Sequence, residues 1–150
     1  MDLLTVSDAM HHGVVTCSAA AGLGAVVEAM AEHAIHCVVA IDEGPPDEDD
    51  DRLWGVVSDL DLLRGLRSAT ELDAGNLADL DTVTVAPEDS LAWAADAMLQ
   101  RGIAHLVVVT GGRPVGVLST LDIARAVRGR VLDRAADAAR GSSRPGSVSP

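Results

Sequence analysis

The sequence repeats itself, and this repeat restricts the fold more than any other feature. When the chain is shifted by 68 positions, residues 14–41 fall on residues 82–109 with seven identities and no gap. At a shift of 61 positions, residues 55–64 fall on residues 116–125 with six identities. The two shifts differ by seven residues, because the first copy carries a long acidic segment at residues 42–52. Such a chain is predicted to fold as two similar units that share a core.

Each copy predicts the element order β-α-β-β-α, and thus an α/β (α+β) fold. An extended segment precedes a helix with one apolar face, and a short strand rich in β-branched residues, a hairpin, a second strand and a second helix follow. In the first copy the elements are expected at residues 14–17, 23–33, 37–41, 53–57 and 59–66. In the second copy they are expected at residues 82–85, 91–101, 106–109, 115–118 and 120–127. Ala34 and Gly102 are expected to end the two first helices.

The repeat also predicts the division of the chain. Residues 1–66 are expected to form the first unit and residues 80–128 the second, with residues 67–79 as the linker and lead-in between them. Residues 129–150 are expected to form a short Ala- and Arg-rich helix that ends near residue 140, followed by a disordered Gly/Ser/Pro tail.

Composition excludes several classes of function. A formal net charge of −12 repels nucleic acid and anionic membranes. Phe and Tyr are absent, and Trp54 and Trp93 are expected to pack or to form an interface rather than to stack on a ligand. There is no secretory signal and no stretch near the roughly 18 to 20 apolar residues of a membrane span. We therefore expect a cytoplasmic protein in which Cys17 and Cys37 are reduced.

One motif occurs twice and carries the strongest chemical signal. Residues 55–61 and 116–122 each contain a glycine, two apolar residues, a serine at the strand-to-helix junction and an aspartate three positions on. The serine hydroxyl and the amides at the helix N-terminus suit a phosphate, and the aspartate can accept hydrogen bonds from a ribose diol. The alternative is helix capping alone, with serine as N-cap and aspartate completing a capping box. Two copies at equivalent places favour a binding site.

On this motif and the repeat, residues 6–127 resemble the CBS-domain family, named for cystathionine β-synthase. The resemblance implies a stand-alone Bateman-type module, in which tandem repeats pack through their sheets as a pair with pseudo-two-fold symmetry. It also implies that the cleft between the units binds AMP, ADP, ATP, adenosine or an S-adenosylmethionine derivative. By that resemblance, Ser58 with Asp61 and Ser119 with Asp122 would hold the phosphate or sugar and the ribose hydroxyls.

The resemblance further implies that each cleft is shared between the units, with backbone and apolar contacts from the first two strands of the opposite unit. Ser58 and Asp61 would work with Val83, Thr84, Ile103, Ala104 and His105. Ser119 and Asp122 would work with Val15, Thr16, Ile35, His36 and Cys37. The expected function is therefore a regulatory, ligand-sensing module without a covalently bound cofactor, read by an unknown protein partner. The alternative is a ligand-free dimeric interaction scaffold.

Cations are scarce near the motif. Arg64 and Arg125 follow the aspartates by three positions, and either pairing along the helix or a ligand role is open. A triphosphate would meet repulsion, so adenosine, AMP or S-adenosylmethionine fits better. No serine or cysteine stands beside a base and an orienting acid, and no metal-ligand set is present, so the chain is not expected to be an enzyme.

The remaining candidates have simpler interpretations. His11 and His12 are expected in a solvated loop rather than at a metal, while His33, His36 and His105 are phosphate contacts or structural residues. Cys17 and Cys37 are expected to be small buried hydrophobes rather than a redox switch. The acidic segment is expected to be solvated rather than to bind a divalent cation. The small helical faces at residues 25–31 and 94–97 are expected to form a homodimer interface.

Overall fold

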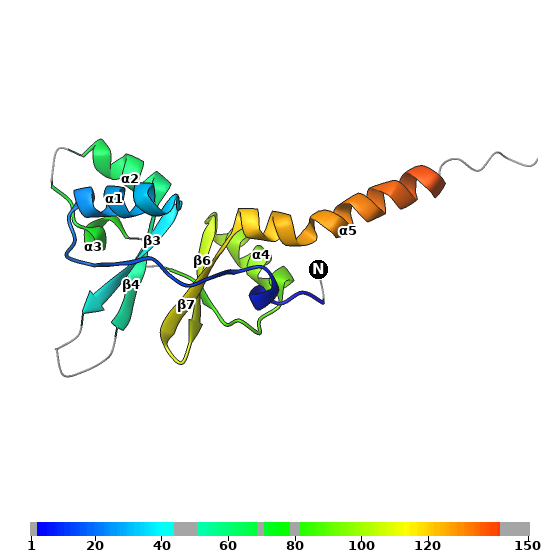
Figure 1. Ribbon diagram of the computed structural model, residues 1–150, viewed down its shortest axis with the longest axis horizontal. Helices are drawn as coiled ribbons and strands as arrows, with labels where there is room; N and C mark the ends of the chain where they lie inside the picture. The colour runs from blue at the N-terminus through cyan, green and yellow to red at the C-terminus, as the bar shows by residue number, and fades with distance from the viewer. Residues whose placement is uncertain (1–2, 44–50, 69–70, 79–81, 142–150) are drawn as a thin grey trace, which may run out of the picture.

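The computed structural model describes residues 3–43, 51–68, 71–78 and 82–141 (Figure 1). The first unit contains β2 (Thr16–Ser18), α1 (Leu23–His33), β3 (Cys37–Glu43), β4 (Asp51–Ser58), α2 (Asp59–Leu66) and α3 (Ala74–Leu77). The second unit contains the 3₁₀ helix η1 (Val6–Asp8), β1 (His11–His12), β5 (Thr84–Val85), α4 (Leu91–Arg101), β6 (His105–Thr110), β7 (Arg113–Ser119) and α5 (Thr120–Gly141). This arrangement confirms the predicted α/β class and the repeated order of elements.

Local signals fix the helix ends. The helices α1, α2 and α4 have the predicted bounds, and Ala34 and Gly102 end α1 and α4 in the left-handed conformation, with φ of 52° and 64°. The side chains of Ser58 and Ser90 accept hydrogen bonds from amides in the first turns of α2 and α4. Such caps satisfy backbone groups that a helix end would otherwise leave unpaired.

Two sheets carry the pseudo-symmetry of the repeat. Their strand orders are β2-β3-β4 and β1-β7-β6-β5. In each sheet the first strand of the repeat pairs in parallel with the second, and the second pairs antiparallel with the third. The register shifts between Ala40 and Ile41 in one sheet and between Val108 and Val109 in the other, 68 positions apart in the sequence. The two copies of the repeat therefore share even the position of the register shift in their antiparallel strand pairs.

Alternate residues of the inner strands serve different cores. In β3, Val38 and Ala40 pack toward α1 with Val26, whereas Val39 and Ile41 pack in a cluster that includes Val107 of the other sheet. Successive side chains of a strand point to opposite faces, so each sheet is buried on both sides. The cluster between the sheets joins the two units into one body.

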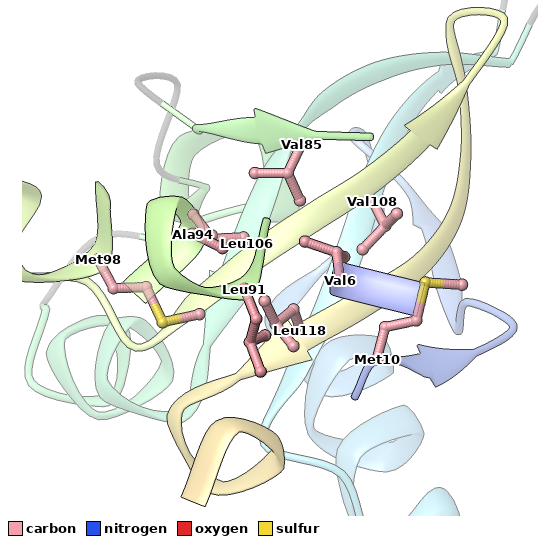
Figure 2. Packing of buried hydrophobic residues seen from close by; sticks show 9 residues of the cluster. All are labelled: Val6, Met10, Val85, Leu91, Ala94, Met98, Leu106, Val108 and Leu118. Carbon is pink, nitrogen blue, oxygen red and sulfur yellow. The ribbon is translucent and has the colours of Figure 1, made fainter. Parts of the chain in front are cut away.

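The N-terminal segment crosses to the second unit. Val6 and Met10 lie in its core with Leu91 and Leu118 (Figure 2), and His11 pairs with Val117 of β7. The predicted first unit, residues 1–66, thus contains a segment, residues 6–12, that packs on the second unit. The reason is tertiary: β1 pairs with the outer side of β7, and η1 places Val6, which is fully buried, in the apolar core.

The segment predicted as a linker also contributes to a core. Within residues 67–79, α3 places Ala74 and Ala78 in the core of the first unit, and Asp73 caps this short helix by accepting from the amide of Asn76. Four helical residues give too little periodicity to be recognised in the sequence.

The last helix is longer than either predicted piece. The predicted helices at residues 120–127 and 129–140 form one helix, α5, whose residues from Arg128 to Arg140 are exposed and project from the body (Figure 1). The predicted tail beyond Gly141 and most of the acidic segment lie outside the described residues. Within the described part of the chain, no helix combines the length and apolar content of a membrane span.

Two inter-unit cavities as the candidate functional site

The first motif forms a capping box at the start of α2. The amide and hydroxyl of Ser58 donate to Asp61 Oδ2 over 2.9 and 2.6 Å, and the amide of Asp61 donates back to Ser58 Oγ over 3.3 Å. Arg64 Nη1 donates to the other carboxylate oxygen, Oδ1, over 2.9 Å. The capping interpretation of the motif is thus confirmed for this copy.

The second motif repeats this geometry at the start of α5. Ser119 donates to Asp122 Oδ2 over 2.9 Å from its amide and 2.6 Å from its hydroxyl, and the amide of Asp122 donates to Ser119 Oγ over 3.2 Å. Arg125 stands farther off, with 3.7 Å between Nη1 and Asp122 Oδ1. The outer oxygen of Asp122 is therefore held less closely than that of Asp61.

Each motif also lines a cavity between the units, so its serine and aspartate can contact a ligand in addition to capping the helix. The Ser58 cavity has a volume of about 410 Å³. It lies between α2 of the first unit and, in the second unit, the end of α4 and the start of β6. From the first unit it is lined by Val56, Ser58, Asp59, Leu60, Asp61 and Arg64. From the second unit it is lined by Thr82, Arg101, Gly102, Ile103, Ala104 and His105.

The Ser119 cavity is the counterpart, with a volume of about 510 Å³. From the second unit it is lined by His105, Val117, Ser119, Leu121, Asp122 and Arg125. From the first unit it is lined by Val14, Val15, His33, Ala34, Ile35, His36 and Cys37, and β1 with its following turn adds His11, His12 and Gly13. Residues 33–37 here and residues 101–105 in the Ser58 cavity are related by the 68-residue shift.

Comparison with known proteins agrees with this geometry. The sequence model of the CBS domain matches residues 6–68 and 74–129, which together make up most of the chain. The chain belongs to the CBS-domain family. Among curated proteins, no sequence match is found.

Solved structures of CBS domain pairs share the fold. The CBS domain pair of protein MJ0100, in complex with 5′-methylthioadenosine and S-adenosyl-L-methionine, matches with a TM-score of 0.75 and 19% identity over 85% of this chain and 98% of that one. The CBS domain protein PAE2072 from Pyrobaculum aerophilum, complexed with AMP, matches with a TM-score of 0.72 and 27% identity over 87% and 99%. CBSX2 in complex with AMP matches with a TM-score of 0.66 and 25% identity over 85% and 98%.

This CBS pair brings most of the predicted site residues together. Ile103, Ala104 and His105 lie across the Ser58 cavity from Ser58 and Asp61. Ile35, His36 and Cys37 lie across the Ser119 cavity from Ser119 and Asp122, and Val15 joins them there. Their role in binding stays a prediction.

Three predicted residues lie elsewhere. Thr16 and Thr84 are exposed on β2 and β5, and Val83 packs against the core of the second unit, so none of them is among the described residues that line either cavity. Thr82 lines the Ser58 cavity instead, and its hydroxyl accepts from the amide of Val56 over 3.2 Å. Thr82 precedes β5, so the second unit contributes to this cavity from the segment before the strand rather than from the strand itself.

Sequence reasoning missed other lining residues. His33 and Arg101 end the helices α1 and α4, and both line a cavity. The 68-residue shift pairs these two basic residues and could have identified them. His11 and His12, expected in a loop, form β1 and line the Ser119 cavity, and only the tertiary path of the N-terminal segment reveals this.

His105 belongs to both cavities. It is half-buried, and burial lowers the pKa of its imidazole, although Asp59 opposes this effect. His36 lies beside it at the inter-unit boundary, with its Nδ1 3.2 Å from Asp59 Oδ2. Among the described residues, no group of three or more His, Cys, Asp and Glu side chains could hold a metal ion.

The two cysteines are free and lie on opposite faces of one sheet. Cys17 packs toward α1, whereas Cys37 is buried in the cluster between the sheets. Burial raises the pKa of the Cys37 thiol to about 12 and also raises that of Cys17. Thiols that point to opposite faces of a sheet cannot be bridged without movement of the backbone, so the geometry favours packing over a redox switch.

The expected interface of small residues needs one correction. Ala94 of α4 is fully buried in the core of its own unit and cannot contact another chain. The exposed apolar residues of α4 are Trp93 and Leu99. On α1, by contrast, Ala25 and Val27 are exposed as expected.

Proposed function

We propose that this CBS pair is a regulatory module that binds an adenosine-containing ligand in one or both inter-unit cavities. One observation carries the proposal: each serine-aspartate corner of one unit lies across a cavity from the helix-to-strand corner of the other unit. Related CBS proteins complexed with AMP, 5′-methylthioadenosine or S-adenosylmethionine support this choice of ligand class.

The corners contain the groups that a nucleoside needs. One oxygen of Asp61 is occupied by the cap, and the other can exchange Arg64 for a ribose hydroxyl. The exposed fraction of the Asp61 side chain is 16%, so a hydrogen bond there is partly shielded from water. On the opposite wall, Ile103 offers an apolar surface for the adenine ring.

Regulation follows from the position of the ligand. A molecule that contacts both walls of a cavity stabilises those arrangements of the two units in which both walls are in reach. The ligand can shift the population of these arrangements only to the extent that it binds one arrangement more tightly than another. We propose that a protein partner reads this difference.

The proposal is tested by calorimetric titration and thermal shift of the full chain with AMP, ATP, adenosine, 5′-methylthioadenosine and S-adenosylmethionine. At a ligand concentration of about 100 times Kd, binding stabilises the native state by about 2.7 kcal/mol and raises Tm. Asp61→Ala and Asp122→Ala are expected to weaken binding to the Ser58 and Ser119 cavities, respectively, by about tenfold or more, because each removes a charged acceptor. Asp61→Asn and Asp122→Asn, which keep a capping oxygen, show whether lost binding reflects lost folding.

Asp137→Ala is the matched control. Asp137 also lies on a helix and pairs with an arginine three positions on, with 2.6 Å between Asp137 Oδ1 and Arg140 Nη2, but it is far along α5 from both cavities. Its binding should equal that of the wild type. Absence of binding to every ligand, in protein shown to be free of nucleotide, contradicts the proposal.

A ligand-free dimeric scaffold is the second candidate, favoured by exposed apolar residues on α2 and α5: Leu60, Leu63, Leu66 and Leu121. We propose a homodimer in either case, which light scattering at micromolar concentration tests. Native mass spectrometry separates the two candidates, because a co-purified adenylate contradicts the scaffold. We also propose a cytoplasmic location, in which both thiols stay reduced.

A further inference from the structure

All five histidines of the chain line the Ser119 cavity. They come from four places in the fold: β1, the end of α1, the turn before β3 and the start of β6. They are His11, His12, His33, His36 and His105. Imidazole is the side chain whose charge ordinarily changes between pH 5 and 8. This cavity therefore gathers every imidazole of the chain in one lining.

The permanent charges of the cavity nearly cancel. Among the described residues that line it, Asp122 is the one carboxylate and Arg125 the one guanidinium, and they lie 3.7 Å apart. The remaining titratable group of the lining, the Cys37 thiol, is neutral because burial raises its pKa to about 12. From α2, Asp59 pairs with His36, and Asp59 and Asp61 both act electrostatically on His105. The histidines thus set the net charge.

The Ser58 cavity lacks this property. Its described lining contains two arginines, Arg64 and Arg101, against two carboxylates, Asp59 and Asp61, and it shares only His105. Its charge therefore changes with pH through a single imidazole. The two cavities are related by the repeat, but they differ in the number of histidines and arginines in their linings.

We propose that the Ser119 cavity binds the phosphate of an adenosine ligand such as AMP, and that protonation of its histidines controls the affinity. The inference rests on the proposed function, which concerns adenosine ligands in general. It adds a chemical class, a phosphorylated adenosine, and a regulatory signal, the proton, for one of the two cavities.

Linkage gives the direction of the effect. A phosphate dianion beside an imidazole favours imidazolium, so binding takes up protons and affinity falls as pH rises. The four exposed histidines are screened by water and each contributes modestly. His105 is half-buried and burial favours its neutral form, so a bound phosphate would change its protonation most.

The test is calorimetric titration of the full-length Asp61→Ala variant, which leaves every lining residue of the Ser119 cavity in place, with AMP between pH 6.5 and 8.0. A phosphate monoester has a second pKa of about 6, so the ligand is already mostly a dianion in this range. Affinity for AMP is expected to fall by roughly fivefold for each imidazole whose pKa rises by one unit in the complex. Buffers of different ionisation enthalpy should reveal net proton uptake. The uncharged ligand 5′-methylthioadenosine should bind with an affinity independent of pH.

A variant with His11, His12, His33 and His36 all replaced by glutamine provides the control. All four side chains are exposed, so the fold should survive, which circular dichroism checks. Made in the Asp61→Ala background, it should reduce the pH dependence of AMP binding to the part that His105 contributes, and keep its affinity for 5′-methylthioadenosine.

The outcomes separate the two proposals. Binding of AMP with the same affinity from pH 6.5 to 8.0 overturns the inference and leaves the proposed function standing. The same holds if the pH dependence appears in the Asp122→Ala variant and not in Asp61→Ala, because it then belongs to the Ser58 cavity. Failure of AMP and 5′-methylthioadenosine to bind Asp61→Ala at any pH overturns the inference alone, whereas failure of every tested ligand to bind the wild type overturns both proposals.

Discussion

Gly116 lies where the backbone of β1 crosses β7. A Cβ atom added at this glycine would stand 2.5 Å from the carbonyl oxygen of His11, closer than real Cβ contacts. Gly116→Ala is therefore expected to destabilise the protein by roughly 1 to 3 kcal/mol, and to displace β1 and its two histidines from the Ser119 cavity. Urea denaturation measures the first effect.

Gly129→Ala is the matched control. Gly129 lies in the exposed half of α5, and a Cβ there would meet nothing within 4 Å. The same substitution should stabilise the protein by up to about 1 kcal/mol, because alanine favours a helix over glycine. Equal destabilisation by both variants would show that the close contact between Gly116 and the backbone of β1 is not the cause.

We expect the two thiols to make the stability of the fold depend on pH in the alkaline range. The chain contains neither Lys nor Tyr, so Cys17 and Cys37 are its only side chains that ordinarily titrate between pH 8 and 11. The folded state keeps Cys37 protonated, since burial raises its pKa to about 12, whereas the unfolded chain releases this proton above about pH 8.5.

Stability should therefore be complete below about pH 8.5 and fall toward pH 12, by about 1.4 kcal/mol per pH unit for Cys37 in the steepest range. Urea denaturation at pH 8, 9.5 and 10.5 measures this slope. Cys37→Ala should reduce it, and an unchanged slope would show that another group causes it.

At the level of elements, local and tertiary signals explain what the sequence could predict. The bounds of α1 and α4 followed from apolar spacing and from Ala34 and Gly102, all of which act within a few residues. The serine-aspartate corners were predictable because the motif occurs twice. In contrast, β1 and α3 are short and exist because of contacts with distant strands, which no local pattern records.

The N-terminal segment should stabilise the unit to which it crosses. Val6 is fully buried among side chains of α4, β6 and β7, so Val6→Ala is expected to cost roughly 1 to 3 kcal/mol. Hydrogen exchange should show the largest loss of protection in β6 and β7, not in β3 and β4.

Val27→Ala removes the same atoms from an exposed position on α1, where 37% of the residue is accessible. Its effect on stability should be within about 0.5 kcal/mol. If Val6→Ala were equally mild, the packing of η1 against the second unit would not matter for stability.

At the scale of the whole molecule, the hydrophobic cluster between the sheets connects the two units, and thereby the two cavities, through packed side chains. Val39 and Ile41 of one unit meet Val107 of the other there, and His105 forms part of both cavity walls. If ligands bind as proposed, a charged ligand in one cavity would act on His105, which the other cavity shares, and any such coupling would be reciprocal in the binding free energies.

The crossing of the N-terminal segment also has a consequence during synthesis. Val6 is synthesised well before its core neighbours Leu91 and Leu118, which follow it by 85 and 112 positions in the chain. The first unit can collect its strands and helices while translation continues, but the second core closes only after residue 118 has emerged. Until then, the segment around Val6 lacks the core in which it is buried, and a nascent chain interrupted between the repeats would expose it.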